Sequence, residues 1–196
     1  MNDHLDNFLA AQHAFSERVH SISEDQWQAG TPDSEWSVAD LVAHLVEEHR
    51  WAAALVHGMD LDTARKIVAG SRNLPVDGGV GANLAELWNE ACAGSADAFS
   101  GDGALDRQVA LSRGSTGARD YCSEMIFDLV VHSWDLQVAI GYDGELPADL
   151  VDTVYAQAQS LGDLAASDMF DAPVTVADDA PTIDKLVALT GRAPQS

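Results

Sequence analysis

Hydrophobic residues recur every three or four positions along most of this chain, a spacing that places them on one face of an α-helix. The pattern predicts an all-α fold, a four-helix bundle with a short C-terminal extended arm and helix. The expected helices lie at about 3–22, 37–57, 83–99, 118–140 and 147–170, the arm at about 172–177 and the last helix at about 182–189.

Boundary signals mark two of these helices. Ser37 is an N-cap candidate, and Asp40 follows three residues later, so each side chain can bond the other's backbone N–H. Gly141 is a natural C-cap for the helix before it. The hydrophobic pattern is weaker in three other stretches. There we expect a short helix at about 60–68, a glycine- and proline-rich connector at 74–81, and an extended piece at 107–112 that belongs to no sheet.

Composition narrows the functional classes. The chain has 196 residues, 46% of them hydrophobic, and we expect residues 1–196 to form a single domain. Its 32 acidic residues against 10 basic ones give a formal net charge of -22, which repels nucleic acid and anionic membranes. No apolar run approaches the roughly 20 residues that span a bilayer. We therefore expect no nucleic-acid or membrane partner, and we expect a small-molecule substrate.

The two cysteines, Cys92 and Cys122, fit neither a disulfide framework nor a Cys-x-x-Cys metal motif. The N-terminus has neither the basic start nor the apolar core of an export signal. We therefore expect a cytoplasmic protein. The sequence leaves the oligomeric state open, with a homodimer as one option.

The candidate chemistry lies in the predicted helix at 118–140. Asp128 and His132 are four residues apart, so both side chains lie on one face of that helix, about 6 Å apart along its axis. A carboxylate and an imidazole on a rigid element suit a divalent metal ion. Two ligands do not make a tight site, and the third must come from another helix.

His44 is the best candidate for the third ligand, because it lies on the apolar face of the predicted helix at 37–57. Glu48 lies on the same face, where an acid must be paired, protonated or bound to a metal. Two other interpretations stay open. His44 could be a hydrogen-bonded core residue, and the polar stripe formed by Glu124, Asp128, His132 and Asp135 could face solvent.

Three segments carry a resemblance to a known family: 31–44, ending in His44; 128–136, with its Asp-x-x-x-His pair; and 172–192, ending in Leu-Thr-Gly-Arg. Together they resemble an actinobacterial family of uncharacterised proteins. That family is similar to the metal-binding N-terminal domain of mycothiol-dependent maleylpyruvate isomerase and, more distantly, to DinB-like four-helix proteins. The isomerase has glutamate where Asp128 stands, and a separate C-terminal domain that we expect this chain to lack.

The resemblance implies a metal ion held by His44, Asp128 and His132, with mycothiol as co-substrate. Zinc is the expected metal, and nickel and manganese accept the same ligands. Glu48 and Asp135 are expected to support a ligand from behind or to line the substrate side. The leading hypothesis is a thiol-dependent transferase or isomerase acting on a small electrophile. The alternatives are a non-enzymatic metal-binding or interaction protein and a metal-dependent hydrolase.

Overall fold

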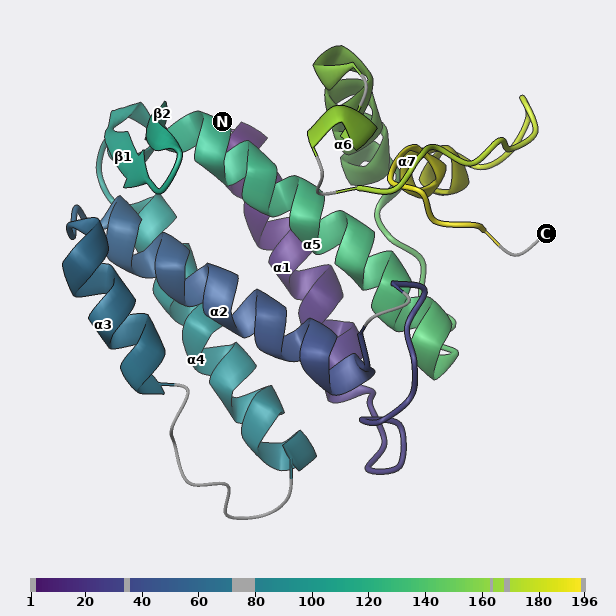
Figure 1. Ribbon diagram of the computed structural model, residues 1–196, viewed down its shortest axis with the longest axis horizontal. Helices are drawn as coiled ribbons and strands as arrows, with labels where there is room; N and C mark the ends of the chain where they lie inside the picture. The colour runs from purple at the N-terminus through teal and green to yellow at the C-terminus, as the bar shows by residue number, and fades with distance from the viewer. Residues whose placement is uncertain (1–2, 34–35, 72–79, 163, 168–169, 195–196) are drawn as a thin grey trace.

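The computed structural model describes residues 3–33, 36–71, 80–162, 164–167 and 170–194 and confirms the predicted all-α fold. Its body consists of the long helices α1 (Asp3–His20), α2 (Val38–Val56), α4 (Val80–Ser100) and α5 (Ala118–Ile140). α2 packs along α4, and α1 packs along α5, as Figure 1 shows. α3 (Leu61–Ser71) lies against α2 on the outside of this bundle.

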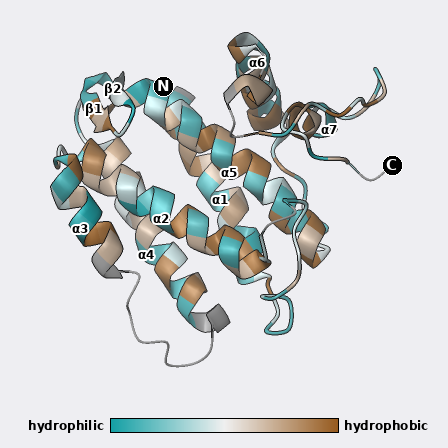
Figure 2. Cartoon of the chain, viewed as in Figure 1, coloured by the Kyte–Doolittle hydropathy of each residue, from teal (hydrophilic) through white to brown (hydrophobic). Residues whose placement is uncertain are grey.

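Large aromatic side chains fill the space between the four helices. Phe8 and Phe15 of α1 meet Trp88 and Phe99 of α4, and all four are buried. Their rings pack edge to face, with centroids 4.8 Å apart for Phe8 and Phe99 and 4.7 Å apart for Phe15 and Trp88. Figure 2 shows apolar and polar residues alternating along the helices. This spacing gives each surface helix one apolar face, which packs against the interior.

Helix α5 differs from the others because neighbours cover it on most sides. Its buried residues follow one another without interruption from Leu129 to Leu136, so they include positions on every side of the helix. α1, α2, α6 and α7 all contact it. A polar group on this helix is therefore placed in the interior, which requires a partner for it.

Two boundary signals in the sequence are confirmed. Ser37 and Asp40 form the predicted capping box at the start of α2. Gly141 caps the end of α5 in the left-handed conformation, with φ at 67°. These two caps fix the ends of the helices that carry the candidate ligands.

The prediction of an extended piece outside any sheet at 107–112 is wrong. Residues Gln108–Leu111 form strand β1, which pairs antiparallel with β2 (Gly114–Gly117) in a hairpin. Val109 and Leu111 are buried while their neighbours are exposed, the alternation of a half-buried strand. Gly114 at the turn has φ at 124°, a conformation that suits glycine. The hairpin leads directly into α5.

The prediction of one helix from 147 to 170 is also wrong. α6 (Ala148–Leu161) ends at Gly162, whose φ of 80° breaks the helical path. A single 3-10 turn, Leu164–Ser167, follows. The last helix, α7 (Thr182–Leu189), packs against α6, and residues 172–177 form the irregular arm expected there.

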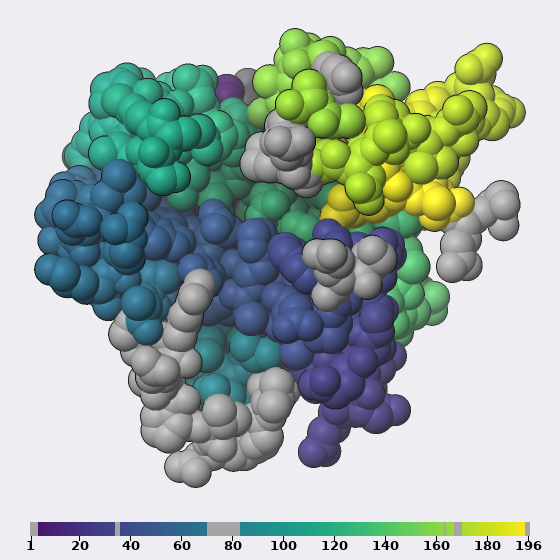
Figure 3. Space-filling view, in the orientation of Figure 1, coloured from purple at the N-terminus to yellow at the C-terminus, as the bar shows by residue number. Residues whose placement is uncertain are grey.

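The connector predicted at 74–81 falls mostly outside the described residues, and α4 begins at Val80, within it. In the part of the chain that the structure describes, no helix has both the length and the apolar character needed to span a membrane. Figure 3 shows the C-terminal residues lying against the loop that precedes α2. Within this contact, Arg192 lies 3.3 Å from Asp33 of the loop.

Candidate metal centre

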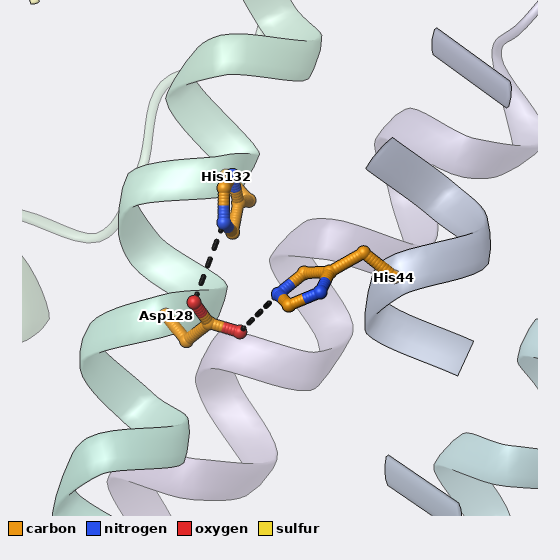
Figure 4. Close-up of side chains that lie close together, drawn as sticks. All are labelled: His44, Asp128 and His132. Atoms are coloured by element: carbon orange, nitrogen blue, oxygen red, sulfur yellow. Dashed lines mark ion pairs between the residues drawn. The ribbon is translucent and has the colours of Figure 1, made fainter. Parts of the chain in front are cut away.

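Two helices supply the three predicted ligands. His44 is on the second turn of α2, and Asp128 and His132 are one turn apart on α5. In Figure 4 the Asp128 carboxylate lies between the two imidazole rings, with a dashed line to each. Among the described residues, this is the group of histidine, cysteine and acidic side chains whose atoms could hold one metal ion, and all its ligand atoms lie within 4.8 Å of one another.

The two contacts of Asp128 use different oxygens. Its Oδ2 lies 3.5 Å from Nε2 of His44, and its Oδ1 lies 3.3 Å from Nε2 of His132. Both histidines therefore direct the same ring nitrogen toward the carboxylate. A cation between these atoms would meet two imidazole nitrogens and one carboxylate oxygen, which is the donor set of several catalytic zinc sites.

One side of the group is open to solvent. The side chains of His44 and Asp128 are 31% and 30% exposed, whereas that of His132 is 8% exposed. Solvent therefore reaches the group from the side of His44 and Asp128. The His132 side is closed by protein.

The electrostatics of the group favour a positive charge at its centre. Burial would raise the pKa of Asp128, but the neighbouring His132 and His44 outweigh burial and hold that pKa well below its usual range. Burial would lower the pKa of His132, but Asp128 and Asp135 raise it to about 9. Without a metal, a proton on His132 supplies this positive charge, and a metal ion must displace it.

Asp135 supports His132 from behind. Its Oδ2 lies 2.9 Å from Nδ1 of His132, and the Asp135 side chain is fully buried. Two turns of helix separate it from Asp128, so its carboxylate reaches the rear nitrogen of the ring and not the open centre. The supporting role of Asp135 stays a prediction.

Glu48 lies one turn after His44 on α2 and is half-buried. Burial raises its pKa, the negative charge of Asp128 raises it further, and His44 opposes this effect. Glu48 therefore lies close enough to both ligands to respond to their charges.

Two residues at the site were not predicted from the sequence. The ring of Trp36 lies 4.7 Å from that of His44 and 5.4 Å from that of His132, centroid to centroid. Arg192, after the last helix, donates hydrogen bonds to Asp135. Both residues lie inside the segments that carry the family resemblance, which is the signal that could have identified them.

The solvent-facing alternative does not hold for the whole polar stripe of α5. Glu124 does face outward and pairs with Arg113 on the surface, but His132 and Asp135 are buried. The histidines of α1 are not part of the group: His13 and His20 are exposed, and His20 bonds Asn89 of α4.

Residues 8–137 match the model of a protein family described as the mycothiol maleylpyruvate isomerase N-terminal domain, and this range contains all three candidate ligands. Two solved structures resemble this fold, both of a mycothiol-dependent maleylpyruvate isomerase, one of them a single-residue variant. Each has a TM-score of 0.60 and covers 80% of this chain and 68% of its own, at 15% identity for the variant and 14% for the other.

Two curated relatives come from Mycobacterium tuberculosis, one from strain CDC 1551 / Oshkosh and one from strain H37Rv, and both are described as uncharacterised proteins. Each is 28% identical over 155 residues, which cover 77% of this chain and 75% of the relative. The resemblance inferred from the sequence is confirmed.

Proposed function

This chain belongs to the mycothiol maleylpyruvate isomerase N-terminal domain family, and from this membership we propose that it is a divalent-metal-dependent enzyme that uses a thiol, mycothiol, to act on a small electrophile. The reaction is a transfer of the thiol to the electrophile or a thiol-assisted isomerisation of it. We also propose that the chain forms one domain and works in the cytoplasm, in keeping with its free cysteines and acidic composition.

The observation that carries this proposal is the convergence of His44, Asp128 and His132. Their ligand atoms come from two helices that are distant in sequence, yet they lie within 4.8 Å of one another. The Nε2 atoms of both histidines point to the same carboxylate. The family match spans all three residues, and the side-chain geometry brings them together.

The donor set fits a divalent ion with open coordination positions. Two imidazoles and one carboxylate suit zinc, and nickel and manganese also accept them. When bound, the ion would supply a Lewis acid that lowers the pKa of a coordinated thiol, so that the reactive thiolate is present at neutral pH. The partial exposure of His44 and Asp128 leaves a path for such a thiol.

Other residues around the metal ligands would orient the ligands, limit the access of water and exchange protons. Asp135 would hold the proton on Nδ1 of His132 and so keep Nε2 free as a ligand. Trp36 would cover one side of the two imidazoles and limit the access of water there. Glu48, beside Asp128 and His44, would orient the His44 ring or exchange a proton with the thiol or the electrophile.

The cysteines of the chain do not replace an external thiol. Burial raises the pKa of the Cys92 thiol, and burial raises the pKa of Cys122 to about 12. Neither side chain belongs to the candidate metal centre. A thiolate for the reaction must therefore come from a separate molecule.

The test combines mycothiol with a panel of small electrophiles in the presence of zinc or of a chelator. Monobromobimane labelling would follow the thiol, and chromatography would follow the electrophile. A transferase consumes both compounds, whereas an isomerase changes the electrophile without net loss of thiol. We expect activity that requires metal, is lost in His44→Ala and is kept in His13→Ala, an exposed histidine outside the site.

The competing functions give different results in the same assay. A hydrolase using a metal-bound water would convert an ester or amide with metal alone and would not need the thiol. A non-enzymatic metal-binding protein would take up zinc but convert no member of the panel. Equal conversion with zinc and with chelator would contradict the proposal.

A further inference from the structure

Arg192 is a buried arginine whose donors are all engaged. Its Nε donates to Oδ1 of Asp135 at 2.8 Å, and its Nη2 donates to Oδ2 of Asp135 at 2.7 Å. The same Nη2 also lies 3.3 Å from Oδ2 of Asp33. Its Nη1 faces the carbonyl and hydroxyl oxygens of Thr190, at 3.4 and 3.2 Å. The guanidinium therefore has no N–H group left over to bind the carboxylate of a substrate.

The pair between Arg192 and Asp135 decides where the proton of His132 lies. Both oxygens of Asp135 accept from the guanidinium in a two-point contact, the geometry of an ionised carboxylate with arginine. The contact of 2.9 Å between Oδ2 and Nδ1 of His132 must then carry a proton on the nitrogen. This hydrogen bond fixes the plane of the ring and leaves Nε2 facing Asp128.

The contact between Arg192 and Asp33 reaches the other side of the site. Asp33 belongs to the loop before α2, and its carbonyl accepts the backbone N–H of Trp36 at 3.0 Å. The Trp36 ring stacks on that of His132, with 27° between the ring planes. One guanidinium thus touches both the carboxylate behind His132 and the loop that carries the indole over it.

We propose that Arg192 is a positioning residue of the metal centre: through Asp135 it fixes the ring of His132, and through Asp33 it fixes the loop that carries Trp36. This role rests on the proposed metal-dependent function. It assigns the C-terminal segment, distant in sequence from all three ligands, an indirect part in setting metal affinity. Arg192 acts on the metal only through other residues.

The deciding experiment compares Arg192→Lys with Arg18→Lys. Arg18 is the matched control, because it is also buried and bonds Gln137 and the carbonyl of Gly144, away from the ligands. Lysine keeps the charge in both variants and loses the two-point geometry. The dissociation constant for zinc would be measured by competition with a chelating dye, and cobalt-substituted protein would be compared by its visible spectrum.

We expect Arg192→Lys to bind zinc about 10- to 100-fold more weakly, the usual effect of losing a residue that supports a ligand, with an altered cobalt spectrum. Arg18→Lys should lower the melting temperature and leave affinity and spectrum unchanged. Unchanged affinity and spectrum in folded Arg192→Lys would overturn the proposal, as would equal losses of affinity in both variants.

A second variant decides the matter if Arg192→Lys does not fold. Asp135→Asn is isosteric and keeps one oxygen for Nδ1 of His132, but it loses the ionised pair with Arg192. It should weaken zinc binding by about tenfold or more, and an affinity equal to the unmodified protein would overturn the proposal. Failure of the unmodified protein to bind zinc at all would instead overturn the proposed function, and the positioning role with it.

Discussion

The indole of Trp36 stacks on the imidazole of His132, with ring centroids 5.4 Å apart and 27° between the planes. The same indole lies against His44, so one aromatic side chain contacts both histidines of the candidate metal centre. Trp36 is thus well placed to report on an ion that enters between these rings.

The first prediction uses Trp36 as a reporter. Adding zinc to chelator-treated protein should change the tryptophan emission, because a metal ion replaces the proton that His132 holds beside the indole. In Trp36→Phe the change should disappear, although zinc still binds. A zinc-dependent change of the same size in Trp36→Phe would show that the signal arises elsewhere.

The second prediction concerns the ligands. The purified protein should contain one divalent ion per chain, measured by elemental analysis. His44→Ala, His132→Ala and Asp128→Asn should each lower metal affinity by at least about tenfold, since each removes one of three ligands. Asp128→Glu should retain more metal than Asp128→Asn, because glutamate keeps a carboxylate as a ligand. Equal metal content in His132→Ala and the unmodified protein would rule out this site.

The third prediction separates a catalytic from a structural site. A site with three protein ligands keeps a coordination position for an exchangeable molecule, whereas a structural site is closed by a fourth. Cobalt-substituted protein should therefore change its visible spectrum when a small thiol is added, because sulfur replaces oxygen on the metal. With cobalt occupancy confirmed, an unchanged spectrum at millimolar thiol would favour a structural role.

The fourth prediction concerns acid stability and His49. This histidine is fully buried among Phe8 and Trp88, and burial lowers its pKa to about 3. The unfolded chain would bind a proton at His49 below its ordinary pKa of about 6.5, and the folded chain would not. The stability present above pH 6.5 is therefore lost as pH falls toward 3, by about 2 kcal/mol at pH 5.

Urea unfolding at pH 5 and pH 7 measures this effect. His49→Phe should show a smaller difference between the two pH values than the unmodified protein, whatever its stability at pH 7. His20→Gln, at an exposed position on α1, is the control and should keep the full difference. A pH dependence unchanged in His49→Phe would assign the effect to other groups.

The periodicity of the sequence was enough to predict the helices that carry the site. α5 occupies the predicted range at 118–140. The spacing of its apolar residues indicated a helix, and Gly141 indicated where that helix ends. The hairpin at 108–117 was missed since each strand is only four residues long, too short for alternation to be distinguished from a loop. The break at Gly162 was missed because a lone glycine inside a helical pattern does not always end it.

Some residues of the candidate site could likewise be predicted from the sequence, and others could not. The Asp128 and His132 spacing is local, so helical geometry predicts it directly. His44 could be proposed as the third ligand because it lies on the apolar face of its predicted helix. The family resemblance strengthened this proposal. Arg192 could not be predicted from spacing, since its contact with Asp135 joins residues 57 positions apart through packing of the C-terminal segment. Trp36 lies in a loop, where hydrophobic periodicity carries no information.

The division of the ligands between α2 and α5 has a consequence for unfolding. An ion held by His44, Asp128 and His132 would be a reversible cross-link between two segments far apart in the chain, closing a long loop. Separation of α2 from α5 would then require release of the ion, so the unfolding rate should fall as zinc concentration rises. Amide hydrogen exchange would locate this effect on the facing turns of the two helices, while α3, outside the cross-linked pair, would continue to exchange at its metal-free rate.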